Sequence, residues 1–407
     1  MMSAEGPFLS ALIARLDEPE YNLAAYGVAF AFALIIEAPV IMMMSASTAL
    51  VKDYYSFIRL KRFTYVLSGG LTLLMLIMII PALFYFITED LIGLPAEVAG
   101  LTHIATIILL PWPGAIGYRR FCQGILIRNN MTRRVAYGTV VRLTTMSFTA
   151  VLFFTYLDVP GVVVGASALS IAVVAEAIAS RLMTAGVIKK IGQIPSSDEK
   201  ITYREIFSFY YPLALTSLLS MGVQPLVTFF VGKSRMALES LAVLPVITSF
   251  VFIFRAFGLS YQEVIIAKMD KDKFNFIPLR NYAFILAGIL SSVLFIISFS
   301  PLSDFWFENV SGLSKALSDF SKVPLQIMVI IPALTVWISF QRAMLVNGKN
   351  TKLITLGTAI EIVIITIVMY TTVNIFSLTG AIAATTSFII GRLSANLYFN
   401  KYVSLTN

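Results

Sequence analysis

The stretch 22-NLAAYGVAFAFALIIEAPVIMMMSASTAL-50 decides the fold class, because it carries one charge, Glu37, in a run long enough to cross a bilayer. A transmembrane helix needs roughly 20 mostly apolar residues. Uncharged cores of the same kind recur at 71–87, 162–174 and 364–373. The chain has 407 residues, 58% of them hydrophobic and 13% charged, whereas soluble domains are roughly 45–50% apolar and 25% charged. The composition therefore predicts an all-α integral membrane protein without a soluble domain.

The remaining composition excludes several classes of function. The net charge of +8 does not indicate nucleic-acid binding, because the basic residues sit in short segments between apolar spans. Cys122 is the only cysteine and His103 the only histidine, so we predict no disulfide, no metal site and no cofactor beyond a coupling H⁺ or Na⁺. The sequence has no HExxH, GxSxG or GxxxxGK[ST] motif, which argues against an enzyme and against a nucleotide-driven pump.

Apolar runs between polar breaks predict about twelve transmembrane helices. We expect them at residues 1–16, 22–50, 63–87, 99–128, 134–156, 160–188, 206–232, 239–269, 281–300, 320–347, 352–374 and 378–400. Basic loops, such as 52–62 and 128–134, alternate with acidic or neutral ones. Because basic loops stay in the cytoplasm, both termini are expected there, in a plasma membrane such as the bacterial inner membrane.

The chain contains an internal repeat. Shifting it on itself by about 218 residues, and then by one more, pairs similar residues almost without gaps. The pairs include Pro7 with Pro225, Arg62 with Arg280, Pro113 with Pro332, Gly138 with Gly357 and Gly161 with Gly380. Each half holds an even number of spans, so the halves share one orientation and predict two pseudo-symmetric six-helix lobes around a central cavity.

The repeat also sets the predicted domain limits. The N-terminal lobe covers 1–190, a cytoplasmic linker covers 191–204, and the C-terminal lobe covers 205–407. Thr202 and Glu205 form a capping box that should start the seventh helix. That helix starts about a dozen residues before the position that matches residue 1, so we predict that helix one is truncated. We expect the true start upstream; the alternative is a half-span that begins at residue 1.

Ionisable residues inside spans are the candidate functional residues, because each costs about 2.5–3.5 kcal/mol to insert. The repeat places Glu37 opposite Arg255, and Arg142 opposite Glu361. One hypothesis is an ion-pair gate in which Glu37 and Arg255 meet across the axis between the lobes. The alternative is that each charge pairs within its own lobe. Gln262 extends a polar stripe from Arg255 along one helix face and favours a wet surface.

A second group of candidates surrounds a broken helix. Pro111 and Pro113 should kink helix four. Arg119 and Arg120 near its end, Arg142 of helix five and Arg342 of helix ten are candidates for a cytoplasm-facing anion vestibule. Guanidinium groups bind carboxylate and phosphate as forks. The alternative is that these side chains extend to the membrane interface. Glu176, Arg181 and Arg392 are interpreted as packing residues within a lobe.

Glu5 is the remaining acid at membrane depth. Together with Glu37 it is a candidate for binding a coupling H⁺ or Na⁺. The alternative for Glu5 is an ordinary terminal residue near solvent. The expected partners are membrane lipid and a small-molecule solute, and the chain is expected to be a monomer.

Several segments resemble a known family. The stretches 207-FSFYYPLAL-215, 224-QPLV-227, 23-LAAYG-27 and 263–272 are similar to progressive ankylosis (ANK-like) proteins and, more distantly, to the MOP superfamily, which includes MATE exporters and flippases for lipid-linked sugars. The resemblance implies a MATE-like fold with alternating access, and ANK-like relatives imply export of anions such as pyrophosphate, citrate or nucleotide. The helix-one aspartate of MATE exporters appears replaced by Leu9, which weakens any transfer of their coupling site.

Three functions follow from these observations. The first is a secondary active transporter, an exporter of a small organic or phosphorylated anion. The second is a MATE-type H⁺- or Na⁺-coupled antiporter of drugs or cations. The third is a flippase for a lipid-linked substrate. The sign of the charges that line the cavity separates the first two, because arginines predict anions and glutamates predict cations.

Overall fold

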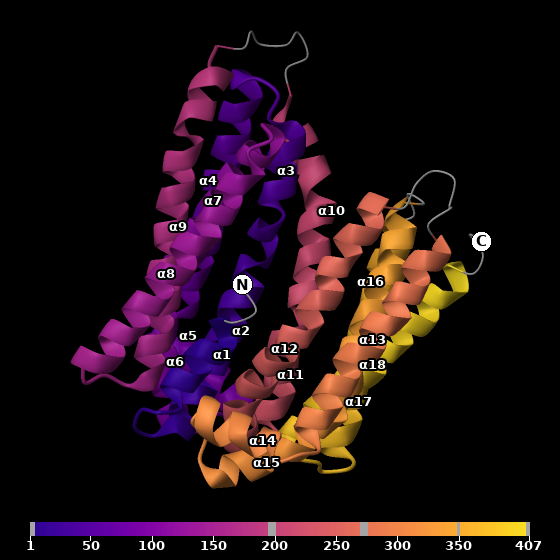
Figure 1. Ribbon diagram of the computed structural model, residues 1–407. Coiled ribbons are helices and arrows are strands. Elements are labelled where there is room, and N and C mark those ends of the chain that lie inside the picture. Colours follow the sequence, from indigo (N-terminus) through magenta and orange to yellow (C-terminus); the bar gives the residue numbers. More distant parts are fainter. Residues whose placement is uncertain (1–4, 194–200, 269–275, 348–350, 404–407) are drawn as a thin grey trace. The chain divides into compact units, whose positions relative to one another are not determined.

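The computed structural model describes residues 5–193, 201–268, 276–347 and 351–403. Within them the chain is almost wholly helical (Figure 1). Ten helices or helix pairs are long and apolar enough to cross a membrane, and large apolar side chains such as Phe284 and Ile289 are more than half exposed. Such surfaces suit hydrocarbon, not water. The chain is therefore a multi-pass membrane protein, as the composition predicts; the side on which its termini lie stays a prediction.

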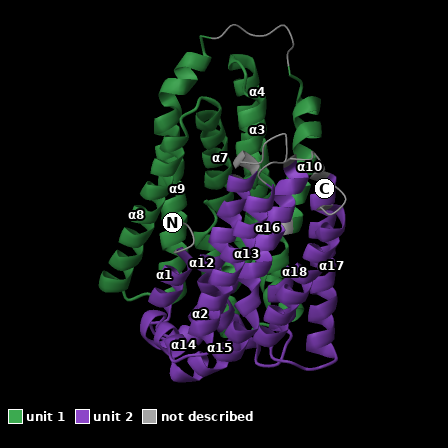
Figure 2. Cartoon of the chain, turned by 45° about the vertical axis from the view of Figure 1, so that its right-hand side comes forward, with its two compact units in different colours: residues 1–2, 28–225 green, residues 3–27, 226–407 purple. Residues whose placement is uncertain are grey.

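The chain forms two compact units, shown in different colours in Figure 2. Unit 1 comprises residues 28–225 with residues 1–2, and unit 2 comprises 3–27 and 226–407. The helices of the first half are α1 (Glu5–Ile13), α2 (Pro19–Ile41), α3 (Met43–Leu50), α4 (Tyr54–Met78), α5 (Pro81–Tyr85), η2 (Phe86–Ile92), α6 (Ala96–Ile108), α7 (Trp112–Arg128), α8 (Thr132–Tyr156) and α9 (Gly161–Ile191).

The second half repeats this order. Its helices are α10 (Tyr203–Met221), α11 (Val223–Gly232), α12 (Ala237–Lys268), α13 (Phe276–Ser298), α14 (Leu302–Asp304), η3 (Phe305–Val310), α15 (Lys315–Ile327), η4 (Met328–Ile330), α16 (Ile331–Asn347), α17 (Thr351–Asn374) and α18 (Gly380–Val403). The first residues of α6 and α15, of α8 and α17, and of α9 and α18 are each 219 residues apart. The helices thus follow the repeat found in the sequence.

Two segments lie in a unit other than the one that chain order suggests. α1 packs against α12 in unit 2, where a Cβ on Gly6 would lie 2.7 Å from Cβ of Ser249. α10, which follows the linker, packs against α3 and α4 in unit 1. The lobe limits 1–190 and 205–407 stay a prediction about the repeat, and residues 194–200 of the linker are outside the described residues.

Some helices begin or end at other residues than predicted, because capping residues and prolines fix their limits. The helix expected at 63–87 is α4, which begins at Tyr54 because Asp53 and Ser56 form a capping box. It ends at Met78, three residues before Pro81 opens α5. The expected break in helix four is confirmed, since α6 ends at Ile108 and α7 begins at Trp112. The capping box of Thr202 with Glu205 at the start of α10 is also confirmed.

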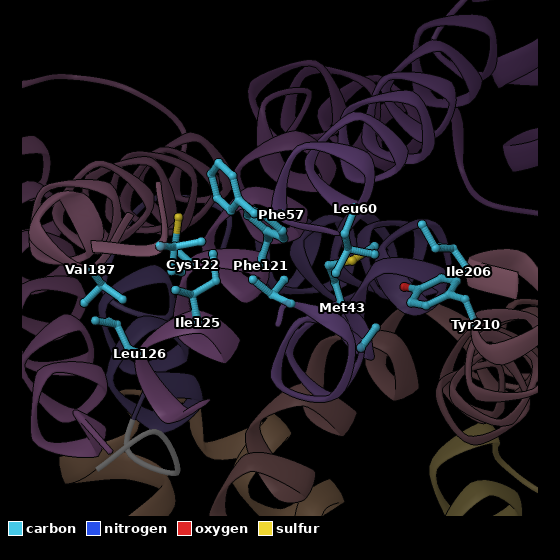
Figure 3. Close-up of a cluster of buried hydrophobic side chains, with 13 residues drawn as sticks. Met43, Phe57, Leu60, Phe121, Cys122, Ile125, Leu126, Val187, Ile206 and Tyr210 are labelled. Atoms are coloured by element: carbon cyan, nitrogen blue, oxygen red, sulfur yellow. The ribbon is translucent and has the colours of Figure 1, made fainter. Parts of the chain in front are cut away.

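The core of unit 1 joins α3, α4, α7, α9 and α10 (Figure 3). Its buried side chains are Met43, Ala46, Val51, Phe57, Leu60, Phe121, Cys122, Ile125, Leu126, Val187, Ile191, Ile206 and Tyr210. A Cβ on Gly124 would collide with the Ser47 side chain, so glycine permits the close approach of α7 to α3. In a bilayer such van der Waals packing is the main attraction between helices, because lipid tails are as apolar as the side chains.

Two smaller cores hold unit 2 together. Tyr261, Val336 and Phe340 lie in the one between α12, α13 and α16, where the Tyr261 hydroxyl donates to the Leu279 carbonyl at 2.6 Å. The other joins α16 to α18 around Phe399.

Candidate functional site

Each unit buries a cluster of charged side chains inside its spans. The unit 1 cluster consists of Glu37 on α2, Arg119 and Arg120 on α7, Arg142 on α8 and Glu176 on α9. The unit 2 cluster consists of Arg255 on α12, Arg342 on α16, Glu361 on α17 and Arg392 on α18. The two sets occupy corresponding helices of the repeat, although the charges at matching positions differ.

Glu176 is the centre of one half of the unit 1 cluster. It forms an ion pair with Arg119, and the two side chains are 0% and 2% exposed. The other oxygen of its carboxylate accepts from Nε2 of Gln123 at 3.1 Å. A buried carboxylate with two such donors is well satisfied, and removal of either charged partner would leave a buried charge uncompensated.

Glu37 is the centre of the other half. Its carboxylate accepts a hydrogen bond from Nε1 of Trp112, the first residue of α7 after the proline break. The guanidinium of Arg142 lies 6.0 Å from the centre of the Trp112 ring. Arg119, Arg120 and Arg142 all lie close enough to Glu37 to act on its charge. Three arginines and two glutamates leave the unit 1 cluster with one net positive charge.

The unit 2 cluster is built around a single acid, Glu361. Nε of Arg392 lies 2.9 Å from one carboxylate oxygen, and Nη2 of Arg342 lies 3.8 Å from the other. Arg342 also donates to the Thr358 hydroxyl at 3.2 Å. The acid is therefore already shared by two guanidinium groups.

Arg255 is the third arginine of this cluster. It interacts electrostatically with Glu361, Arg342 and Arg392, yet it forms no ion pair within 4 Å with another residue in the described part of the chain. Its guanidinium lies 5.9 Å from the ring of Phe252 on its own helix, and its Nε is buried without a hydrogen-bond partner. Three arginines and one glutamate give the unit 2 cluster two net positive charges.

The structure places the other candidates as follows. Gln262 is half-buried on α12, two turns from Arg255, and within the described part of the chain it forms no hydrogen bond with a residue of the cluster. Glu5 is buried in the first turn of α1. Glu37 and Arg255 belong to different units, and Glu37 has the Trp112 partner within its own unit. The gate between Glu37 and Arg255 and the coupling roles of Glu5 and Glu37 stay predictions.

Sequence reasoning missed Trp112, and it gave Glu176 and Arg392 only packing roles. A signal for the last two exists in their position, since each is an ionisable residue in the middle of the sixth helix of its half, where a charge needs a partner. Glu176 pairs with Arg119 of the fourth helix, and Arg392 pairs with Glu361 of the fifth helix of its half. Trp112 lies between two prolines, and nothing in its sequence context indicates which side chain its indole reaches.

Comparisons with known proteins identify the fold but no family. No family model matches the chain, and no curated protein matches it. An inward-facing multidrug resistance MATE family transporter of the MOP superfamily has 14% sequence identity and a TM-score of 0.76, over 98% of this chain and 94% of that one. The lipid II flippase MurJ, in an inward closed conformation, has 19% identity and a TM-score of 0.72, over 99% of this chain and 85% of that one.

A mutant of the MATE transporter VcmN from Vibrio cholerae is also similar, with 14% identity and a TM-score of 0.60 over 99% of this chain and 93% of that one. These likenesses confirm the predicted MATE-like fold over the whole chain. They do not assign a role to any residue. The resemblance to ANK-like proteins stays a prediction, and part of one stretch that carries it, 269–272, is outside the described residues.

Proposed function

We propose that this protein is a secondary active transporter that carries a small organic or phosphorylated anion across the membrane by alternating access, most simply as an exporter. The observation that carries the proposal is the unit 2 cluster. Arg342 and Arg392 contact one carboxylate, that of Glu361, and Arg255 lies near the same group without an ion pair of its own among the described residues. Arg255, Arg342 and Glu361 lie in helices long and apolar enough to cross a membrane. An uncompensated arginine at such a depth costs about 2.5–3.5 kcal/mol. Binding of an anionic ligand would neutralise the excess positive charge of the unit 2 cluster and offset this cost.

The chemistry of the group supports an anion in a second way. Guanidinium groups present planar forks of N–H donors, which match the oxygens of carboxylates and phosphates. Thr358 holds one edge of Arg342, and the Phe252 ring lies beneath Arg255. Two of the three guanidinium groups are thus held in place before any ligand arrives, which lowers the entropic cost of binding.

A MATE-type antiporter of drugs or cations, driven by H⁺ or Na⁺, is the second candidate, and the fold of the multidrug transporters favours it. Against it, three arginines lie near enough to act on the charge of Glu37, and its carboxylate already accepts a hydrogen bond from Trp112. A flippase for a lipid-linked substrate is the third candidate, and the likeness in fold to MurJ favours it. A phosphate group in such a substrate would use the same arginines.

The test is transport by the full chain in liposomes. Uptake of labelled citrate and pyrophosphate is measured beside uptake of a cationic dye, for wild type, Arg255→Ala and Arg255→Lys. Arg280→Ala is the control, because Arg280 lies outside the cluster, over Phe276 of α13.

Anion uptake that Arg255→Ala abolishes and Arg280→Ala retains would support the proposal, with partial activity for Arg255→Lys, which keeps the charge and loses the fork. Dye uptake without anion uptake would favour the MATE-type antiporter. Uptake of neither would refute the anion proposal and favour a flippase.

A further inference from the structure

A groove of unit 1 lies between the N-terminal half of α4 and the start of α10. It has a volume of about 390 Å³ and is lined by Arg62, Phe63, Tyr65, Val66 and Tyr203. Four of these five side chains are apolar or aromatic, and Val66 is 76% exposed. The one charge in the lining, Arg62, is exposed. The groove therefore combines an apolar and aromatic lining with one positively charged side chain.

A second arginine is held beside the groove by aromatic rings. The guanidinium of Arg59 lies 4.9 Å from the ring centre of Tyr55 and 4.7 Å from that of Tyr203. Arg59 and Arg62 are three residues apart on α4, so they lie on the same helix face. The rings fix the direction of one guanidinium while its N–H groups stay available.

The described acids at the starts of α4 and α10 cap these two helices. The carboxylate of Asp53 accepts from the Ser56 backbone at 2.8 Å and caps α4. The carboxylate of Glu205 accepts from the Thr202 backbone at 2.7 Å and caps α10. Among the residues that the structure describes, neither Arg59 nor Arg62 forms an ion pair. Within the described residues, the two cations therefore have no carboxylate as an ion-pair partner.

The setting of the groove matches the edge of a bilayer. α4 changes here from a basic first segment, which includes Lys61 and Arg62, to an uncharged apolar one. Tyr65 and Tyr203 line the groove, and tyrosines are enriched where a membrane meets water. Along α10 the exposed rings of Phe207 and Tyr211 stack at 5.8 Å and continue the apolar surface from Tyr203 into the span.

We propose that this groove binds an anionic phospholipid of the surrounding membrane, with the headgroup phosphate on Arg59 and Arg62 and an acyl chain along Val66, Phe207 and Tyr211. Fork-shaped arginines suit the phosphate, and the exposed apolar floor suits the chain. Basic side chains at a membrane surface favour anionic lipids. The site is separate from the buried clusters and does not depend on the transport proposal.

Native mass spectrometry of the full chain in neutral detergent tests this. The chain is titrated with dioleoyl phosphatidylglycerol or dioleoyl phosphatidylcholine, and then with inorganic phosphate as competitor. The variants are Arg62→Gln and the double change Arg59→Gln with Arg62→Gln. Arg280→Gln is the matched control, because Arg280 is the repeat counterpart of Arg62 and lies over Phe276, a residue of its own helix.

We expect wild type to prefer phosphatidylglycerol, with a loss of affinity of about fivefold for each arginine removed and no loss for phosphatidylcholine or for Arg280→Gln. Because Arg62 is exposed, the Arg62→Gln variant should fold like wild type. It therefore still tests the proposal if the double variant does not fold. Equal affinity for the two lipids, or an unchanged Arg62→Gln variant, would overturn the proposal. Displacement of the lipid by inorganic phosphate would show a site for free anions instead.

Discussion

Replacing Glu176 with glutamine should destabilise unit 1 strongly. Glutamine keeps the side-chain volume and an acceptor for Gln123, but it removes the charge that pairs with Arg119. Both partners are almost fully buried, at 0% and 2% exposed, so the remaining guanidinium cannot reach water. Breaking a buried pair from one side costs about 3–5 kcal/mol. Arg119 still lies near Glu37, whose charge acts on it, so we expect the lower end, about 3 kcal/mol.

The free energy of unfolding is measured by denaturant titration of the purified chain in mixed micelles. Asp304→Asn is the control, since Asp304 and Lys322 form a pair at 2.6 Å with 39% and 32% of their side chains exposed. That exposed pair should contribute less than about 1 kcal/mol. A loss for Glu176→Gln no larger than the loss for Asp304→Asn would refute the view that this pair holds α7 to α9.

Two further changes test other parts of the structure by the same measurement. Trp112→Phe removes the donor to Glu37 and should cost about 1–3 kcal/mol, because the carboxylate is buried; a loss within error of zero would show that the hydrogen bond contributes nothing. Gly357→Ala would place a Cβ against the Phe399 ring and should cost about 1–3 kcal/mol through overpacking. Gly288→Ala is its control, because nothing lies within 4 Å of a Cβ at that position. This change should stabilise α13 by about 0.5–1 kcal/mol. Equal effects of the two glycine changes would contradict the packing of Gly357 against Phe399.

Much of the fold follows from the sequence, because a bilayer leaves few choices. Apolar runs of sufficient length must become helices, and the offset of the repeat correctly predicts that α8 and α17 start at matching residues. The break before Trp112 follows from its flanking prolines. The predicted start of α4 at residue 63 is too late, because basic residues such as Arg59 and Arg62 are typical of a cytoplasmic loop. The capping residue Asp53 places the true start at Tyr54.

The candidate sites are less predictable. The sequence shows which spans contain Glu37, Arg142 and Glu361, but the partner of each depends on how the helices are rotated against one another. Glu176 could be matched to Arg119 only once α7 and α9 are in contact. The packing of α1 on α12 also cannot be predicted from the sequence, because the apolar residues of a helix do not specify which helix they will contact.

The central claim is that the unit 2 cluster binds an anion, and equilibrium binding of labelled pyrophosphate to the purified chain tests it most directly. Wild type should bind pyrophosphate, and Arg255→Gln should bind it at least about tenfold more weakly, since a hydrogen bond to a charged group contributes about 1.5–3 kcal/mol. Arg280→Gln should bind like wild type. Wild-type binding that survives Arg255→Gln unchanged would contradict the account.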